Sequence, residues 1–179
     1  MSTNFLIQKN EPEIITLQRP IFMVGCSITT DSKQIYRDAV KLGKEYTAVK
    51  KSGIIQNKRV PWAFVAISKN FSESGNWEYL IGDVINDLSY VPEKLTGCEI
   101  PTGVYAKFIF QPHLKFLWGP AMGLMKKYIY TEWLPNSAYM VRAQSIGEFE
   151  YHDERSLGKH PMIELYVAVN PRRAEITPA

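Results

Sequence analysis

The sequence contains few cysteines and has no long apolar run. Its two cysteines, Cys26 and Cys98, lie far apart, and we expect both to be buried thiols rather than a disulfide. No uninterrupted apolar stretch is long enough to cross a bilayer. The opening MSTNFLIQKN lacks the basic and apolar regions of a signal peptide. We therefore expect a soluble, cytoplasmic protein that does not associate with membranes.

The common catalytic signatures are also missing. The sequence has no GxSxG, Walker, HExxH or CxxC motif, which removes support for the commonest hydrolase, nucleotide-binding and metal-binding classes. His113, His152 and His160 lack the paired spacing of a metal site, so we expect them on the surface or in loops. The sequence predicts neither a metal nor a cofactor.

Charge of one sign is not concentrated anywhere. The 21 Lys and Arg residues against 18 Asp and Glu residues give a net charge of +3, which is too small an excess to argue for nucleic-acid binding. The basic residues Lys50, Lys51, Lys58 and Arg59 are expected in a solvated loop rather than in a phosphate-binding patch. The chain has 179 residues, of which 45% are hydrophobic, and is long enough for one domain with a substantial core.

The first half of the chain predicts one strand, one helix and two strands. These elements cover residues 19–29 (strand), 31–53 (helix), 61–68 (strand) and 77–85 (strand). In the helix, apolar residues recur at steps of three and four, and basic residues take the opposite side. Asp31 is expected to cap its start, and Gly53 is expected to end it.

The second half repeats this order of elements. They cover residues 100–110 (strand), 118–134 (helix), 147–153 (strand) and 161–169 (strand). Pro120 lies in the first turn of the helix, where its missing N–H does no harm, and Pro135 is expected to stop the helix. The sequence identity between the halves is faint, so the repeat is one of element order.

Two such halves predict an α+β fold with internal pseudo-symmetry, in which an antiparallel sheet system carries two helices. The expected organisation is an N-terminal extension over 1–18, a single domain over 19–171 with modules at about 19–98 and 99–171, and a C-terminal tail over 172–179.

The closing strand places one carboxylate among apolar residues. Strand side chains alternate between two faces, so Glu164 and Tyr166 project to the same side of residues 161–169. If that side is a pocket, Glu164 is a lone charge in an apolar wall that requires a cationic partner, and burial raises its pKa in the absence of a ligand. If it is not, Glu164 pairs with a lysine or lies at a solvated rim. Both interpretations stay open.

Aromatic residues occur in nearly every predicted element. Most of them are expected in the core of a domain of this size. However, Trp77 and Tyr79 share one strand face, as do Phe149 and Tyr151. Aromatic side chains gathered around a carboxylate would form a cavity suited to flat, apolar or cationic molecules.

Four segments in the correct order resemble the GyrI-like family of bacterial effector-binding domains. EIPTGVYAKF is similar to its IPAGxYAxF segment, and YIYTEWLPNSAY to its IYxxWLPxSxY helix end. FEYHDE resembles its FExYDE strand, and IELYVAV resembles its closing xExYIPV strand. The resemblance covers residues from about 19 to 171 and is most specific in the second half.

The resemblance implies a tandem pair of βαββ modules with a central ligand cleft at their junction. Members often form the sensor part of MerR- or AraC-type regulators and bind hydrophobic or cationic drugs. An acidic residue on the last strand is a recurrent ligand contact in the family, and Glu164 occupies that position; Trp133 and Tyr105 fall within the matching motifs. Two features depart from the family: Ala168 replaces the usual proline of the closing strand, and no helix-turn-helix precedes the domain, so direct DNA binding is not expected.

Three functions are compatible with these observations. The first is a stand-alone binding protein for small hydrophobic or cationic ligands, held by Glu164 and the aromatic residues Trp77, Tyr79, Tyr105, Trp133, Phe149, Tyr151 and Tyr166. The alternative is a hydrolase of strained, cyclopropanoid-type natural products, with Glu164 as general base and Tyr105 stabilising the oxyanion. The third, least favoured, is a protein-interaction module, because relatives are known as gyrase inhibitors. The oligomeric state stays open.

Overall fold

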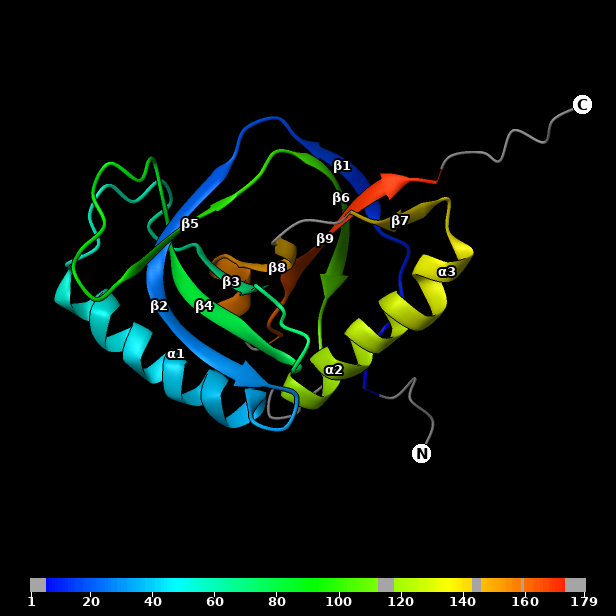
Figure 1. Ribbon diagram of the computed structural model, residues 1–179, viewed down its shortest axis with the longest axis horizontal. Helices are drawn as coiled ribbons and strands as arrows, with labels where there is room; N and C mark the ends of the chain where they lie inside the picture. Colours follow the sequence, from blue (N-terminus) through cyan, green and yellow to red (C-terminus); the bar gives the residue numbers. More distant parts are fainter. Residues whose placement is uncertain (1–5, 113–117, 143–145, 159, 173–179) are drawn as a thin grey trace, which may run out of the picture.

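The protein folds around one antiparallel sheet, as a computed structural model describes for residues 6–112, 118–142, 146–158 and 160–172 (Figure 1). Its strands are β1 (Glu13–Leu17), β2 (Ile21–Asp31), β3 (Phe64–Lys69), β4 (Asn76–Ile85), β5 (Thr96–Ile100), β6 (Gly103–Phe110), β7 (Tyr139–Val141), β8 (Ile146–His152) and β9 (Ile163–Pro171). No helix of the described part is long and apolar enough to span a membrane.

The strand order shows the predicted internal symmetry. The sheet runs β1-β6-β9-β8-β3-β4-β2-β5, and β7 pairs with the end of β9. The first half contributes β2-β4-β3, the second contributes β6-β9-β8 in mirror order, and the two meet where β3 pairs with β8. The α+β class with two helix-bearing halves is therefore confirmed.

Three short strands were not expected from the sequence. β1 lies within the segment expected to be an extension and pairs with β6 at one edge of the sheet. β5 pairs with β2 at the other edge, and β7 has only three residues. Each is too short to show a reliable alternation, and each is held by its partner strand rather than by its own pattern.

The first helix begins later than predicted. α1 spans Ile35–Ser52, and its N-cap, Gln34, makes no side-chain cap hydrogen bond. Asp31 instead accepts hydrogen bonds from the backbone N–H groups of Lys33 and Gln34, in the turn between β2 and the helix. Gly53 ends α1 as expected, with a left-handed φ of 71° that favours glycine.

The second helix contains a π-helical turn. α2 (Trp118–Tyr128) continues through a π turn over Ile129–Trp133 into the short α3 (Leu134–Asn136). The chain leaves the helix one residue after Pro135, close to the predicted stop. The π turn inserts an extra residue into the helix repeat, an irregularity often found near functional sites.

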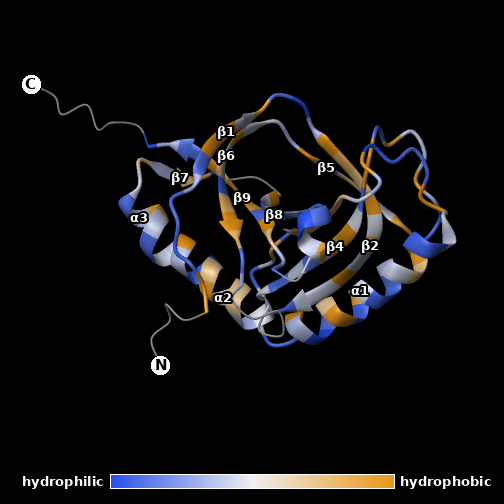
Figure 2. Cartoon of the chain, turned by 180° about the vertical axis from the view of Figure 1, so that it is seen from behind, coloured by the Kyte–Doolittle hydropathy of each residue, from blue (hydrophilic) through white to orange (hydrophobic). Residues whose placement is uncertain are grey.

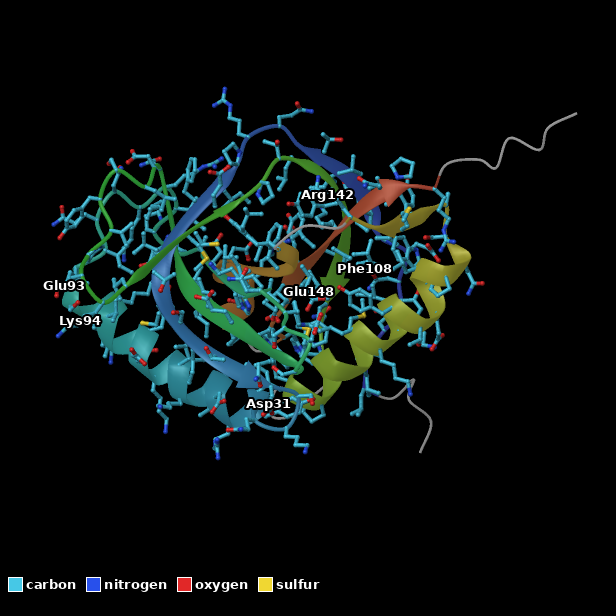
Figure 3. The ribbon with its side chains drawn as sticks, in the orientation of Figure 1. Asp31, Glu93, Lys94, Phe108, Arg142 and Glu148 are labelled. Carbon is cyan, nitrogen blue, oxygen red and sulfur yellow. The ribbon has the colours of Figure 1, made fainter. Side chains whose placement is uncertain are left out.

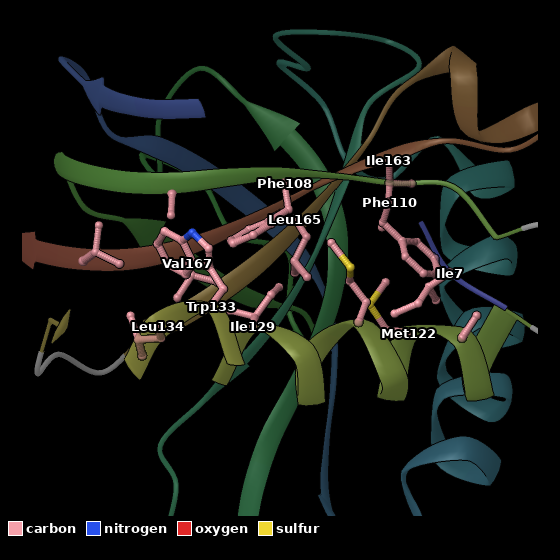
Figure 4. Packing of buried hydrophobic residues seen from close by; sticks show 14 residues of the cluster. Ile7, Phe108, Phe110, Met122, Ile129, Trp133, Leu134, Ile163, Leu165 and Val167 are labelled. Atoms are coloured by element: carbon pink, nitrogen blue, oxygen red, sulfur yellow. The ribbon is translucent and has the colours of Figure 1, made fainter. Parts of the chain in front are cut away.

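Both helices cover the same face of the sheet. Apolar residues are concentrated along β2, β5, β6 and β9, whereas α1 carries alternating bands of hydrophobic and hydrophilic residues (Figure 2). α2 packs on β6 and β9 through a cluster that includes Met122, Ile129, Phe108 and Leu165 (Figure 4). On the opposite face, a second cluster contains Tyr105 and other buried residues from both halves of the chain. Alternation along the strands thus builds two cores, one on each side of the sheet.

α1 is held to the sheet by a buried ion cluster as well as by apolar contacts. Asp83 on β4 is fully buried, 3.0 Å from Lys50 Nζ and 2.9 Å from Lys58 Nζ. It also accepts a 2.7 Å hydrogen bond from the hydroxyl of Tyr46 on α1. The expectation of a solvated basic loop is therefore wrong for Lys50 and Lys58, which neutralise a carboxylate inside the protein. The two cysteines are free and buried, as predicted.

The glycine pair of β2 and β4 allows the two strands to approach closely. Gly25 faces Gly82, and a Cβ added at Gly25 would lie 2.0 Å from the carbonyl oxygen of Ile81. We expect Gly25→Ala to lower the free energy of unfolding by about 3 kcal/mol, since backbone atoms must move. Gly43→Ala is the matched control, because Gly43 lies inside α1 with open space at its Cβ position and alanine should stabilise the helix by about 0.5–1 kcal/mol. Urea unfolding of both variants tests this; equal effects would contradict it.

Candidate functional site

A cleft opens between α1 and α2, over the junction of the two halves of the sheet. Its cavity has a volume of about 540 Å³, within the range of small-molecule sites. It is lined by Ser32, Ile35, Tyr36, Ala39, Ser68, Phe71, Trp77, Tyr79, Trp118, Gly119, Met122, Gly123, Lys126, Tyr130, Gly147, Glu148 and Glu150. The helices supply two walls, and β3, β4 and β8 supply the floor.

Two carboxylates and a lysine form the polar part of this floor. Glu148 and Glu150 project from the same face of β8 and are both largely buried. Lys126 of α2 lies 2.6 Å from Glu148 Oε1 and 3.5 Å from Glu150 Oε1. Glu148 lies near the middle of the molecule (Figure 3). Two negative charges therefore share one lysine in a confined apolar space.

The two carboxylates differ in how well they are satisfied. Glu148 is engaged at both oxygens, by Lys126 and by a 2.8 Å hydrogen bond from the hydroxyl of Tyr130. Glu150 has only longer contacts, 3.5 Å to Lys126 and 3.3 Å to Nε2 of His152. Both carboxylates have one contact at each oxygen, but the contacts of Glu150 are longer and therefore weaker, so Glu150 is the carboxylate more readily drawn to a further donor or cation.

Electrostatics in the cleft keep Lys126 and Glu150 charged. Burial opposes the charge of Lys126, but the carboxylates of Glu148 and Glu150 outweigh it and raise the pKa of Lys126. Burial likewise favours protonation of Glu150, but hydrogen bonding from His152 and the nearby Lys126 charge lower its pKa. The pKa of Tyr79 is raised, mainly by burial and then by the charge of Glu150, so its hydroxyl stays protonated.

Aromatic side chains form the apolar walls. Phe71 stacks on Trp77 with ring centroids 5.5 Å apart, although 61% of Phe71 is exposed at the mouth of the cleft. Trp118 opens α2 and lies 6.0 Å from the ring of His152, which was expected at the surface but is buried behind Glu150. Flat aromatic faces beside a carboxylate suit a ligand with an apolar body and a positive charge.

Tyr36 crosses the mouth of the cleft from α1 to α2. Its ring lies against Gly119, where an added Cβ would approach the ring carbons to 2.9 Å, and its hydroxyl lies against Gly123. The two glycines are one helical turn apart and leave a smooth strip on α2 that accommodates the ring. The ring is 55% exposed, so it covers the cleft without being part of the core.

The structure places only Trp77 and Tyr79, among the sequence-predicted site residues, in this cleft. Glu164 lies on the opposite sheet face, 2.8 Å from Arg155 Nη2 and within 2.6 Å of the hydroxyl of Tyr166, which donates to it. Burial disfavours its charge, but the hydrogen bonds from Arg155 and Tyr166 outweigh burial and lower the pKa of Glu164. Of the two interpretations left open, the structure favours pairing within the chain, with Arg155 rather than a lysine as the cationic partner.

The other predicted residues are distributed over the remaining surfaces. Tyr105, Phe149 and Tyr166 pack together in the core of the opposite face, and the Tyr105 hydroxyl donates to the carbonyl of Pro101. Trp133 donates to Glu11 in a separate groove beside β1. Tyr151 lines a third cavity. These residues do not line the cleft between the helices.

The sequence contained a signal for the carboxylates that the motif analysis missed. Glu148 and Glu150 alternate with Phe149 along the predicted strand 147–153, so they share a face. Lys126 and Tyr130 are four residues apart, which places both on one side of a helix. The pattern does not indicate which face of the strand the helices cover. No group of three or more His, Cys, Asp or Glu residues in the described part could hold a metal.

The chain matches a family of effector-binding proteins. The family described as Cass2, integron-associated effector binding protein, matches residues 14–169. This match confirms the resemblance to effector-binding domains found in the sequence. No curated protein sequence matches the chain.

Several solved structures share the fold. The Vibrio cholerae integron cassette protein VCH_CASS2 is 11% identical, with a TM-score of 0.58 over 92% of this chain and 97% of that one. SAV2435, solved with tetraphenylphosphonium bound, is 16% identical, with a TM-score of 0.64 over 90% of this chain and 94% of that one. The C-terminal domain of EcmrR is 15% identical, with a TM-score of 0.56 over 93% and 99%. These identities support likeness of fold alone.

The lowered pKa of Glu150 predicts a pH-dependent stability. A carboxylate with a depressed folded-state pKa stabilises the fold above its unfolded pKa of about 4.3, and this stabilisation is lost as the pH falls through the folded-state value. We expect Glu150→Gln to cost about 1–3 kcal/mol at pH 7, and this gap to narrow progressively below about pH 4.3. Urea unfolding across pH 3–7 measures it. Glu99→Gln, an exposed site on β5, is the control; a gap that stays constant with pH would contradict the assignment.

The position of Tyr36 predicts that it limits access to the cleft. We expect Tyr36→Ala to increase acrylamide quenching of tryptophan fluorescence, since Trp77 and Trp118 line the cavity that the ring covers. Gly123→Ala should act in the same direction, because the added methyl displaces the Tyr36 hydroxyl. Val40→Ala, on the exposed side of α1, provides the control. Unchanged quenching in Tyr36→Ala would show that the ring does not cover the cleft.

Proposed function

The chain belongs to the Cass2 family of integron-associated effector binding proteins, and we propose that it binds an amphipathic aromatic cation in the cleft between α1 and α2. The observation that carries the proposal is the excess of negative charge on the floor of a cleft with aromatic walls. Glu148 and Glu150 share Lys126, and the contacts of Glu150 are the longer ones. Glu150 is proposed to recognise the charge, while Glu148 positions Lys126.

The apolar part of the affinity comes from the aromatic walls. Burial of apolar ligand surface contributes roughly 25 cal/mol per Å², so a ligand that buries about 200 Å² gains about 5 kcal/mol before the cost of association. Trp77 and Trp118 provide flat faces for this contact, and both line the cleft. A cation over such a face gains a further 0.5–2 kcal/mol, roughly, depending on how well water is excluded.

One donor group of the cleft offers a further contact for a ligand. The indole Nε1 of Trp77 is buried and has no hydrogen-bond partner among the described residues. A buried unpaired N–H costs about 1–3 kcal/mol, and a ligand acceptor that reaches it would remove that cost. The proposed ligand therefore combines a positive charge with aromatic rings, and an acceptor that reaches Trp77 would strengthen its binding further.

A related structure supports this ligand class. SAV2435 was solved with tetraphenylphosphonium, in which four aromatic rings surround one positive charge. We propose that the present chain binds molecules of this kind and does not itself contact DNA. The small net charge of +3 and the packing of both helices on the sheet favour that role.

Removing the charge of Glu150 should separate cationic from neutral ligands. We expect Glu150→Gln to weaken methyltriphenylphosphonium binding at least tenfold, about 1.4 kcal/mol, because the ligand charge loses its counter-ion. Binding of the neutral triphenylphosphine oxide should change less than threefold. Isothermal titration calorimetry measures both affinities, and mass spectrometry of the recovered ligand shows whether it is returned intact or has gained water, as a hydrolase would produce.

Two further variants complete this experiment. Glu99→Gln removes an equivalent charge from the exposed edge strand β5 and should leave both affinities unchanged. Glu164→Gln tests the carboxylate that the family resemblance favours. If Glu164→Gln rather than Glu150→Gln discriminates against the cation, the site lies on the opposite face of the sheet. An equal loss for charged and neutral ligands in Glu150→Gln would refute charge recognition.

A further inference from the structure

We propose a second binding site, on the sheet face opposite the helices, for an oxyanion carried by an apolar body, a carboxylate in the first instance. The site is built around Arg142, which follows β7 and lies beside β1 and β6 (Figure 3). It differs from the cleft between the helices in position, in lining residues and in the sign of its charge.

Arg142 is held in a defined orientation by its neighbours. Its Nη1 donates a 3.1 Å hydrogen bond to the carbonyl of Thr102, and its guanidinium lies 4.9 Å from the centroid of the Tyr105 ring. Gly103 makes room for it, because a Cβ at that position would lie 1.6 Å from Nη1. Gly103 also has a φ of 135°, which other residues rarely adopt. The guanidinium is therefore preorganised on a surface of backbone and aromatic ring.

Two nitrogen atoms on one edge of this guanidinium, Nε and Nη2, are the groups that a ligand would satisfy. Nε and Nη2 of Arg142 are buried and have no hydrogen-bond partner among the described residues, and none of the carboxylates there forms an ion pair with this arginine. These two nitrogens direct their N–H groups to the same side, the geometry with which arginine holds both oxygens of a carboxylate. Two buried N–H groups without an acceptor are unfavourable, and an oxyanion at this edge would satisfy both of them.

A neighbouring cavity supplies the apolar part of the site. It has a volume of about 340 Å³ and is lined by Thr16, Leu17, Gln18, Arg19, Ile21, Arg59, Val60, Val84 and Tyr151. Leu17 is the register partner of Gly103, on which Arg142 rests. Directly paired strand residues project to the same face, so the cavity and the guanidinium lie on the same side of adjacent strands. Leu17, Val60 and Tyr151 pack against the apolar cluster of that face.

The charge around the cavity favours an anion. Arg19 and Arg59 line it and are exposed, and neither forms an ion pair with a carboxylate of the described residues. Among the negative charges of the same face, Asp153 and Glu164 are both bound by Arg155. The ligand carboxylate takes the Nε–Nη2 edge of Arg142, the apolar body lies in the cavity, and Arg19 and Arg59 attract the anion to the mouth.

The probes are 1-naphthoate, its uncharged analogue 1-naphthamide, and inorganic sulfate, titrated by calorimetry into the full chain. We expect the naphthoate to bind at least tenfold more tightly than either of the others, because it alone combines an oxyanion with an apolar body. Arg142→Lys keeps the charge but removes the two-nitrogen edge, and it should weaken naphthoate binding at least tenfold. Arg37→Gln, an exposed arginine on α1, is the control and should have no effect.

A second pair of measurements keeps the proposal testable if Arg142→Lys does not fold. Arg19→Gln/Arg59→Gln changes only exposed side chains, and it should reduce naphthoate affinity severalfold and flatten its dependence on salt. Naphthoate binding should also persist in the presence of saturating methyltriphenylphosphonium, since the two sites lie on opposite faces. Equal binding of naphthoate and naphthamide, binding of sulfate as tight as that of naphthoate, displacement by the cation, or no effect of the arginine variants would each overturn the proposal.

Discussion

The pairing of β3 with β8 is the constraint on which both faces of the protein depend. It joins the two halves of the sheet, with Ala66 opposite Glu150 and Ser68 opposite Glu148. Because side chains alternate along a strand, β8 directs Glu148 and Glu150 toward the helices and Phe149 toward the opposite core. One strand thus provides the charge of the cleft and an anchor of the core behind it. A slip of one residue in this register would exchange the two sets.

In both halves, a tyrosine and a lysine of the helix contact a carboxylate of the sheet, but the ratio of positive to negative charges differs. In the first half, Asp83 meets Tyr46 and two lysines, so one buried negative charge has two positive partners. In the second half, Tyr130 and Lys126 of the helix meet Glu148, while Glu150 adds a second negative charge to the same lysine. The first arrangement is complete within the chain and fixes α1 on the sheet. The second leaves negative charge beside a cavity, which is the condition for binding a cation.

The order of elements and the family resemblance were sufficient to predict the fold. The long elements were found because their periodicities extend over many residues, whereas β1 and β5 depend on pairing with strands distant in sequence. Trp77 and Tyr79 were identified correctly as sharing a face, and this face borders the cleft. Alternation also placed Glu164 with Tyr166, but it could not indicate which face the helices cover or that Arg155, nine residues away, reaches the carboxylate.

The separation of the two faces explains how this fold tolerates wide sequence variation. The related structures keep the architecture at 11–16% identity, with TM-scores of 0.56–0.64. A core requires only apolar residues of suitable size at alternate strand positions, a condition that many sequences meet. Glu148 and Glu150 of β8 line the cleft and lie outside the apolar clusters, so a change at these positions can alter the charge of the cleft without altering those clusters. Under the proposed function, the charge balance around Lys126, rather than the fold, would determine which class of molecule this chain selects.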